Sequence, residues 1–275
     1  MRFDLAEMAK SRGRRRNAEL RPIAGRRSTE YELRRIILRV LEAGAEFRPA
    51  LIDAAVTAQI GLTRDDDRLA ATFSAFRSVM SRLVSSAKSL ISQLLGVEAI
   101  RHDKKWVEQV NAAVGVDLQA IVTSQPLAAD IDLATERNIS LIKGLTDEVA
   151  KRVETAIIDM IVEGRTTKDI AAAIDAAFGF GRKRAAFIAR DQAAKFSGNL
   201  NRIRQQEAGI TTFIWWTVQD ERVRGNPAGR YPNARPSHWD RHDKRYRWDS
   251  PPADGAPGDP VNCRCIARAV LDIEE

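Results

Sequence analysis

The sequence predicts an α+β fold that is mainly α, with a helical N-terminal body followed by a small C-terminal module of short strands and long loops. Residues 211–218 have the β-branched and aromatic content of a strand, and the loop at 225–237 is rich in Gly and Pro. Most of residues 28–208 instead show apolar residues at helical spacing, as in Leu33, Ile36, Ile37, Val40 and Leu41. We therefore expect helices to carry and position the terminal module.

The composition indicates a chain with an ordinary core and an anionic partner. At 275 residues it is long enough for one large or two modest domains. It has no apolar run long enough to cross a bilayer and no apolar stretch of a secretory signal after Met1, so we expect no membrane partner. With 44 Lys and Arg against 37 Asp and Glu, the net charge is +7 and the pI is near 9.7. This balance favours double-stranded DNA as the anionic partner.

The first segment, residues 1–27, is predicted to be a weakly ordered basic arm, because it has few apolar residues to bury. Such an arm would bind the DNA backbone without reading sequence, and its affinity would fall steeply with salt. The alternative is a solvated tail. The residues expected to contact DNA are Arg12, Arg14, Arg15, Arg16, Arg26 and Arg27.

Two helical groups are expected after the arm: a helical domain at residues 28–135, and helices at 136–208 that belong to a C-terminal domain of residues 136–275. Within these groups we predict helix breaks at Gly96, at Gly144 and at a linker of residues 179–181. Gly164 stands where a left-handed C-cap residue belongs. Pro126 disfavours helix at the residue before it, which predicts a joint between the groups.

Several charged residues of the helical body are interpreted as structural. Asp65, Asp66 and Asp67 suit the start of a helix and lack the alternating ligands of a calcium loop. His102 is expected at the surface. Arg190 and Asp191 read as a surface charge pair, or alternatively as a contact that docks the loop after Val218.

The terminal module, residues 209–275, begins with the predicted strand at 211–218. Its alternation places Phe213, Trp215 and Thr217 on one face. Asp220, just past the strand, can accept hydrogen bonds from the following turn, with Arg222 and Arg224 as counter-charges. No nucleotide-binding glycine motif and no catalytic triad can be assembled, so the sequence predicts no catalytic residues and a protein that is not an enzyme.

The module also contains two His and the two Cys of the chain. If Ser237 caps a helical turn, side chains at i and i+4 project on one side, and Cys side chains two residues apart in an extended segment also share a side. Two imidazoles and two thiolates would complete a tetrahedral structural zinc site. The alternative is that the Cys pack as small apolar residues and the His bond to neighbouring groups. The four candidate ligands are His238, His242, Cys263 and Cys265.

Taken in order, the residues of the second half resemble a known family, the phage Mu F-like head morphogenesis proteins, over about residues 136–270. The resembling elements are the helix from Ala189 to Gly209, Trp216, Asp220, Arg222-Val223-Arg224, Arg235-Pro236-Ser237-His238, Tyr246-Arg247-Trp248, Pro251-Pro252 and Gly258 to Cys265. The residues assigned to the motif are Arg190, Trp216, Asp220, Arg222, Arg224 and Arg264.

The resemblance implies a minor head protein of a tailed phage or prophage that acts in procapsid assembly. Its expected partners are the portal protein, procapsid shell or scaffold proteins, and DNA. Its expected location is the virion or procapsid, with the host cytoplasm during assembly. The first half of the chain shows no motif that matches the family.

This chain departs from the family pattern in two places. Residues 225–235 lengthen the loop before His238, and Asp243 stands where the family often has Gly, although Asp tolerates a left-handed turn better than most residues. Two other functions compete with head assembly. One is a metal-dependent nuclease in which His238 or His242 activates water near a bound ion, with Cys263 and Cys265 in the same region. The other is a DNA-binding protein that acts through the basic arm alone.

Overall fold

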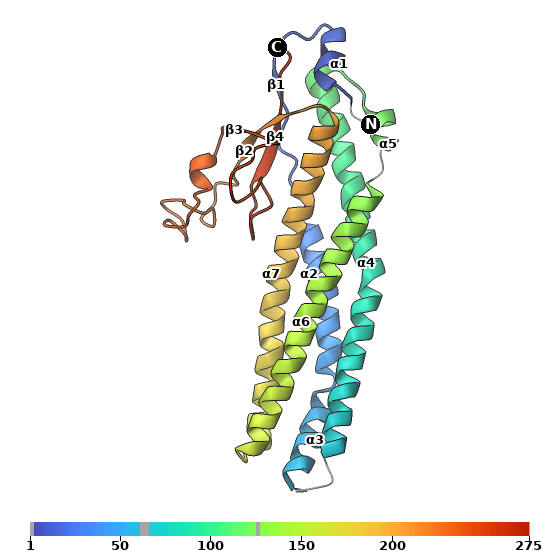
Figure 1. The fold of residues 1–275 in the computed structure, drawn as a ribbon, viewed down its shortest axis with the longest axis vertical. Helices are drawn as coiled ribbons and strands as arrows, with labels where there is room; N and C mark the ends of the chain where they lie inside the picture. Colours follow the sequence, from blue (N-terminus) through green and yellow to red (C-terminus); the bar gives the residue numbers. More distant parts are fainter. Residues whose placement is uncertain (1–2, 61–65, 125–126, 275) are drawn as a thin grey trace. The chain divides into compact units, whose positions relative to one another are not determined.

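The computed structural model of the chain describes residues 3–60, 66–124 and 127–274, and these are mainly helical with a four-stranded antiparallel sheet (Figure 1). The predicted α+β, mainly α class is confirmed. The chain forms two compact units, a helical unit of Glu30–Leu94 and Ile131–Arg190, and a mixed unit of Met1–Thr29, Leu95–Asp130 and Asp191–Glu275. This division differs from the predicted boundary at residue 135, because each unit combines segments that are far apart in the sequence.

The helical unit is built from five helices or parts of helices. Residues 30–45 of α2 (Arg27–Ala45), all of α3 (Arg48–Ile60) and residues 66–94 of α4 (Asp66–Val114) come first. Residues 131–162 of α6 (Ala128–Val162) and residues 167–190 of α7 (Thr167–Glu207) complete it. Apolar side chains at helical spacing are buried in its interior, where the ring of Phe76 contacts those of Phe47 and Phe178 at 5.9 and 6.2 Å between centroids.

Glycine does not interrupt the long helices where breaks were predicted. Gly96 lies inside α4, Gly144 inside α6 and residues 179–181 inside α7. A glycine inside a helix costs about 1 kcal/mol relative to alanine, which the burial of flanking apolar residues outweighs. Gly181 has a packing reason, since a Cβ there would lie 2.9 Å from Val149. The C-cap at Gly164 is confirmed, with a φ of +63°.

Two predicted features fall partly outside the described residues. The helix start at Asp65 and the joint at Pro126 lie there, and the structure describes α4 from Asp66 and α6 from Ala128. Against the expectation from the sequence, residues 67–114 of α4 are long and apolar enough to cross a membrane. One such helix is weak evidence for a membrane span, because the core helix of a soluble protein passes the same test of length and composition.

The mixed unit contains the sheet and the helices that surround its core. Its helices are α1 (Leu5–Ser11), residues 95–114 of α4, α5 (Gln119–Thr123) and residues 191–207 of α7. Its strands are β1 (Ala18–Glu19), β2 (Thr212–Trp216), β3 (Lys244–Arg247) and β4 (Ile266–Leu271), in the antiparallel order β1-β4-β2-β3. The last strand of the chain therefore lies between the first two.

The N-terminal segment is part of this unit and differs from the predicted weakly ordered arm. Leu5, Leu20 and Ile23 are buried in the apolar cluster of the unit, together with Trp106 of α4. The backbone N–H of Leu20 donates to the carbonyl oxygen of Ala269 at 3.0 Å, next to the pairing of β1 with β4. A small number of apolar residues at the right positions is sufficient to hold the segment.

Polar residues of α4 and α7 are also buried inside the mixed unit, against the prediction for His102. The helix continues past Gly96, and His102 is consequently fully buried, with its Nε2 3.3 Å from Asn201 Oδ1. Arg204 is 1% exposed and binds both carboxylate oxygens of Asp103 at 2.8 and 2.7 Å. Burial opposes ionisation of Asp103, but its interactions with His102 and Arg204 outweigh it, so the pKa of Asp103 lies below its ordinary value.

Candidate metal centre

Strand β2 brings the predicted aromatic face into the interior of the module. Phe213 and Trp215 are fully buried, and they pair across the sheet with Ala269 and Ala267 of β4. The strand begins after Gly209, whose φ of +75° ends the preceding helical segment as predicted. The ring of Trp215 meets that of His238 edge-on, with 5.1 Å between centroids. The strand therefore forms the wall behind the histidine.

The turn after β2 is organised by Asp220, as the sequence predicts. Its Oδ1 accepts hydrogen bonds from the backbone N–H of Arg222 at 3.0 Å and from Nη2 of Arg264 at 2.6 Å. The hydrogen bond from Arg264 is the largest cause of a pKa of Asp220 below its ordinary value. Arg222 lies 3.6 Å away as a second cation. The contact to Arg264 connects this turn to the segment that carries the two cysteines.

Arg224 makes a second connection between the histidine loop and the cysteine segment. Its carbonyl oxygen accepts the backbone N–H groups of His238 and Trp239, each at 3.0 Å. Its guanidinium donates to the carbonyl oxygen of Val261 at 2.6 Å. Arg224 therefore fixes the backbone on both sides of the site.

The cysteine segment is held against α7 by a buried carboxylate. Asp191 Oδ1 accepts the backbone N–H of Asn262 at 2.7 Å, and its Oδ2 accepts from Lys195 at 2.7 Å. Asp191 is therefore buried rather than exposed, which corrects the surface-pair interpretation, and it docks the cysteine segment at Asn262 rather than the loop after Val218. The two backbones also approach closely, because a Cβ at Gly198 would lie 2.8 Å from the carbonyl oxygen of Pro257. Arg190 is partly buried on α7.

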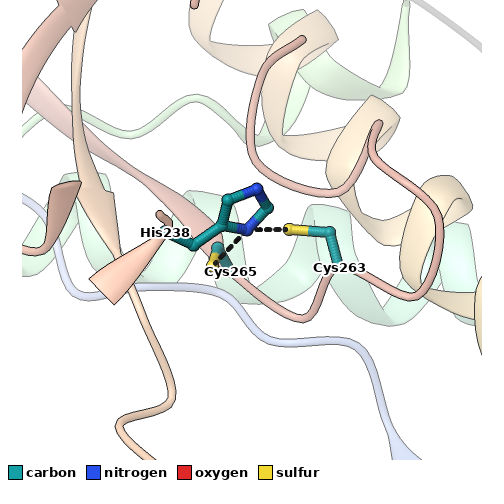
Figure 2. Close-up of side chains that lie close together, drawn as sticks. All are labelled: His238, Cys263 and Cys265. Carbon is teal, nitrogen blue, oxygen red and sulfur yellow. Dashed lines mark hydrogen bonds between the residues drawn. The ribbon is translucent and has the colours of Figure 1, made fainter. Parts of the chain in front are cut away.

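These contacts bring three of the four predicted ligands together (Figure 2). The Nδ1 atom of His238 lies 3.5 Å from Cys263 Sγ and 3.7 Å from Cys265 Sγ, and all three ligand atoms lie within 4.8 Å of one another. The side chains are 2%, 4% and 7% exposed, respectively. As predicted, the two cysteines point to the same side, and in Figure 2 both sulfur atoms are directed at the same ring nitrogen.

Asp254 sets the tautomer of the histidine, a role that no motif in the sequence predicts. His238 Nε2 lies 3.0 Å from Asp254 Oδ2, and Asp254 also pairs with Arg241 at 2.7 Å. Burial opposes ionisation of Asp254, but hydrogen bonds from His238 and Arg241 outweigh it and lower its pKa. An ionised carboxylate only accepts hydrogen bonds, so Nε2 carries the proton. The lone pair of Nδ1 is therefore presented to the two sulfur atoms.

The two thiols share their protons unequally. A hydrogen bond from Cys265 lowers the pKa of Cys263 well below its ordinary value despite burial. The same hydrogen bond and burial raise the pKa of Cys265. The pair can therefore hold one thiolate readily, and a bound cation would favour the second.

His242 does not join this group, which corrects the four-ligand arrangement. The predicted helical turn is a single 3₁₀ turn, η1 (Trp239–Arg241), and His242 follows it in an extended conformation with φ −54° and ψ 133°. The i and i+4 relationship of an α-helix is therefore lost. His242 Nδ1 instead accepts the backbone N–H of Thr217 at 3.1 Å, and its ring contacts that of Trp216. Ser237 does cap the turn, through Asp240 N at 3.2 Å.

Asp243 adopts the left-handed conformation, with a φ of +61°, at the position where glycine was noted as usual. Its backbone N–H donates to the carbonyl oxygen of Trp215 at 2.9 Å and its carboxylate accepts from Arg268 at 3.0 Å. Arg268 in turn lies 4.4 Å from the centroid of the Trp216 ring. The strained turn is thus held by contacts on both of its sides.

The residues predicted to contact DNA are placed differently from one another. Arg12, Arg15 and Arg16 are exposed between α1 and β1, and Arg27 is exposed at the first position of α2. Arg14 donates to the carbonyl oxygen of Val114 at 3.4 Å. Arg26 pairs with buried Glu98 at 2.9 Å, so that its guanidinium is engaged inside the mixed unit.

Part of this chain is similar to known proteins. Residues 151–268 match the family described as Phage Mu protein F like protein, which confirms the resemblance for that part of the chain. An uncharacterized protein of Haemophilus influenzae is 35% identical over 163 residues, which are 58% of this chain and 34% of the relative. This chain therefore spans about one third of the length of that relative. No solved structure matches the chain.

Proposed function

From the match to a family of phage head morphogenesis proteins, we propose that this chain is a minor head protein of a tailed phage or prophage. In this proposal it acts in procapsid assembly through the portal protein, contacts shell or scaffold proteins, and touches packaged DNA. It resides in the virion or procapsid after assembly in the host cytoplasm. The family is a structural head-morphogenesis family that is not typically enzymatic.

The observation that carries the proposal is that residues quoted for the resemblance make internal contacts of the terminal module. Residues 151–268, which match the family, include this module from β2 into β4. Within it, Asp220 contacts Arg264, and Arg224 contacts the carbonyl oxygen of Val261. Side chains used for internal connection suit a protein whose role is to present a rigid surface to its partners.

The buried position of the histidine argues against the nuclease alternative. His238 is 2% exposed, its Nε2 is bound to Asp254 and its Nδ1 faces the two cysteines. A nuclease needs a metal-bound water that reaches a phosphate and a base beside it. The other candidate, His242, bonds to Thr217 and packs on Trp216.

The proposal is tested by co-expression of the full chain with the portal protein of the same phage or prophage, followed by affinity purification and size-exclusion chromatography. We expect a stable complex with the portal and recovery of the chain in procapsids. The double variant Asp220→Ala with Arg224→Ala is compared with wild type. It removes two internal contacts of the module and should weaken portal binding. Procapsids and virions whose proteome lacks the chain would overturn the proposal.

The nuclease alternative has its own test, incubation of plasmid DNA with the protein and Mg²⁺, Mn²⁺ or Zn²⁺. Cleavage that is lost in the variant His238→Ala would replace the structural proposal with an enzymatic one. Absence of cleavage, or equal cleavage by both proteins, is the expected result.

A further inference from the structure

We propose that His238, Cys263 and Cys265 form a structural Zn²⁺ site in which Asp254 orients the histidine and a non-protein ligand such as water takes the fourth position. The proposal is independent of a role in head assembly. It differs from the arrangement expected from the sequence, because His242 bonds to Thr217 and is not a ligand. The carboxylate of Asp254 joins the site instead, as a partner of His238 rather than of the metal.

The two separations between the ring nitrogen and the sulfur atoms match those of a zinc tetrahedron. Zinc binds thiolate sulfur at about 2.3 Å and imidazole nitrogen at about 2.0 Å, and the tetrahedral angle then places sulfur and nitrogen about 3.5 Å apart. The measured separations from His238 Nδ1 are 3.5 Å to Cys263 Sγ and 3.7 Å to Cys265 Sγ. The side chains therefore already stand at ligand distances, and binding needs little rearrangement.

Hydrogen bonding alone leaves this cluster under-satisfied. With Nε2–H donated to Asp254, the imidazole has a single lone pair, on Nδ1, and two sulfur atoms converge on it. One lone pair accepts one strong hydrogen bond, so the second thiol is left with the other sulfur, a weak acceptor, in a buried site. A divalent cation satisfies the lone pair and both sulfurs at once, with the two thiolates neutralising its charge.

The surroundings of the cluster are those of a metal-bound histidine. Histidine ligands of zinc usually donate their second ring N–H to a carboxylate or carbonyl, and this partner fixes the ring and raises its basicity. Asp254 provides that contact, and Arg241 holds Asp254 in turn at 2.7 Å. Within the described residues, His238, Cys263 and Cys265 form the one group of this kind with His or Cys as ligands.

The ion would close the module across its two long loops. His238 lies on the segment between β2 and β3, whereas Cys263 and Cys265 lie in the segment before β4. Zinc ligation would therefore link chain positions 25 and 27 residues apart, in addition to the hydrogen bonds of Arg224. A short loop of this size gains stability from such a link without any catalytic role.

The test uses the full chain purified under reducing, chelator-free conditions, with zinc measured by atomic emission. We expect about one zinc per chain. His242→Ala should keep this stoichiometry, because His242 bonds to Thr217, whereas His238→Ala and Cys263→Ser should lose it. Wild-type protein without stoichiometric zinc, or loss of zinc in His242→Ala, would overturn the proposal.

Two further measurements keep the proposal testable if the ligand variants fail to fold. Wild-type protein reloaded with Co²⁺ should show thiolate-to-cobalt charge transfer and the visible bands of a four-coordinate ion, and their absence contradicts the site. Asp254→Asn should still bind zinc, but with an affinity lowered by about 10- to 100-fold in competition with a chromophoric chelator. Unchanged affinity would show that Asp254 has no positioning role, and that part of the proposal would fall.

Discussion

The carboxylate of Asp191, in the middle of α7, accepts the backbone N–H of Asn262 at 2.7 Å, and Asn262 adopts a left-handed conformation with a φ of +55°. A side chain on a long helix thus fixes a strained residue next to the first of the two cysteines. Since Lys195 and Gln192 also bind this carboxylate, Asp191 is an interior anchor rather than a surface charge.

The first prediction concerns this anchor. Asp191→Ala leaves a partly buried backbone N–H and a partly buried ammonium group without their acceptor, and it should lower the free energy of unfolding by about 2–4 kcal/mol. Asp191→Asn keeps an acceptor oxygen, so its free energy of unfolding should lie between those of wild type and Asp191→Ala. All five Trp lie in the mixed unit, so Trp fluorescence during urea denaturation reports the unfolding of that unit. Asp249→Ala, at an exposed ion pair, is the control and should leave the midpoint nearly unchanged.

The second prediction compares two glycines in helices of the same unit. Gly198→Ala places a Cβ 2.8 Å from the carbonyl oxygen of Pro257, so we expect it to cost about 1–3 kcal/mol through displacement of the cysteine segment. Gly96→Ala meets no atom within 4 Å and should instead stabilise its helix by about 0.5–1 kcal/mol. Urea denaturation followed by Trp fluorescence measures both. Changes of the same sign would mean that the close backbone approach does not govern the response at Gly198.

The third prediction concerns pH and Glu98, which is 2% exposed and binds Arg26, Thr29 and Arg101. Burial opposes its ionisation, but the hydrogen bonds outweigh it, so the pKa of Glu98 in the folded protein lies below its ordinary value. The folded state therefore binds fewer protons than the unfolded state around pH 4. Stability from this group is fully present above the unfolded pKa and is lost as pH falls through the folded pKa.

The variant Glu98→Gln should consequently be less stable than wild type at pH 7, by about 2 kcal/mol or more, and should lose less stability between pH 7 and pH 4. Glu108→Gln, on the same helix but exposed, is the matched control, and its pH profile should follow wild type. Urea titrations at a series of pH values provide the data. Parallel profiles for wild type and Glu98→Gln would show that another group sets the acid limit.

The fourth prediction separates a DNA contact of the N-terminal segment from the effect of net charge. The triple variant Arg12→Ala, Arg15→Ala and Arg16→Ala removes three exposed cations between α1 and β1. If each neutralises one phosphate, the slope of log K against log salt should become shallower by about 3. The control triple Arg182→Ala, Lys183→Ala and Arg184→Ala removes the same charge from an exposed stretch of α7. Fluorescence anisotropy with duplex DNA over a salt series would reveal equal slopes if only net charge matters.

The fold class and much of the terminal module follow from the sequence because they depend on local rules. Alternation in residues 211–218 identifies the buried face of β2, and the same period of two places Cys263 and Cys265 on one side. The turn at Asp220 follows from the tendency of Asp to accept hydrogen bonds from nearby N–H groups.

The errors arise where tertiary contacts outweigh local propensity. Gly96, Gly144 and residues 179–181 continue helices because the flanking apolar residues are buried. His242 leaves the ligand set because the turn before it is 3₁₀ rather than α. Asp254 and His238 do not form a recognised sequence motif, so their contact is visible only in the folded loops.

The place of β4 between β1 and β2 has a consequence for how the protein is made on the ribosome. Residues 18 and 19 pair with residues 271 and 270, so the first strand to be synthesised waits for the last one to leave the exit tunnel. Strand β2 likewise gains its central neighbour only at that moment. Until β4 has left the exit tunnel, β1 and β2 present unpaired edges, and a nascent chain in that state needs protection from aggregation. Completion of the sheet therefore depends on β4, and truncation within β4 would leave the mixed unit unable to close.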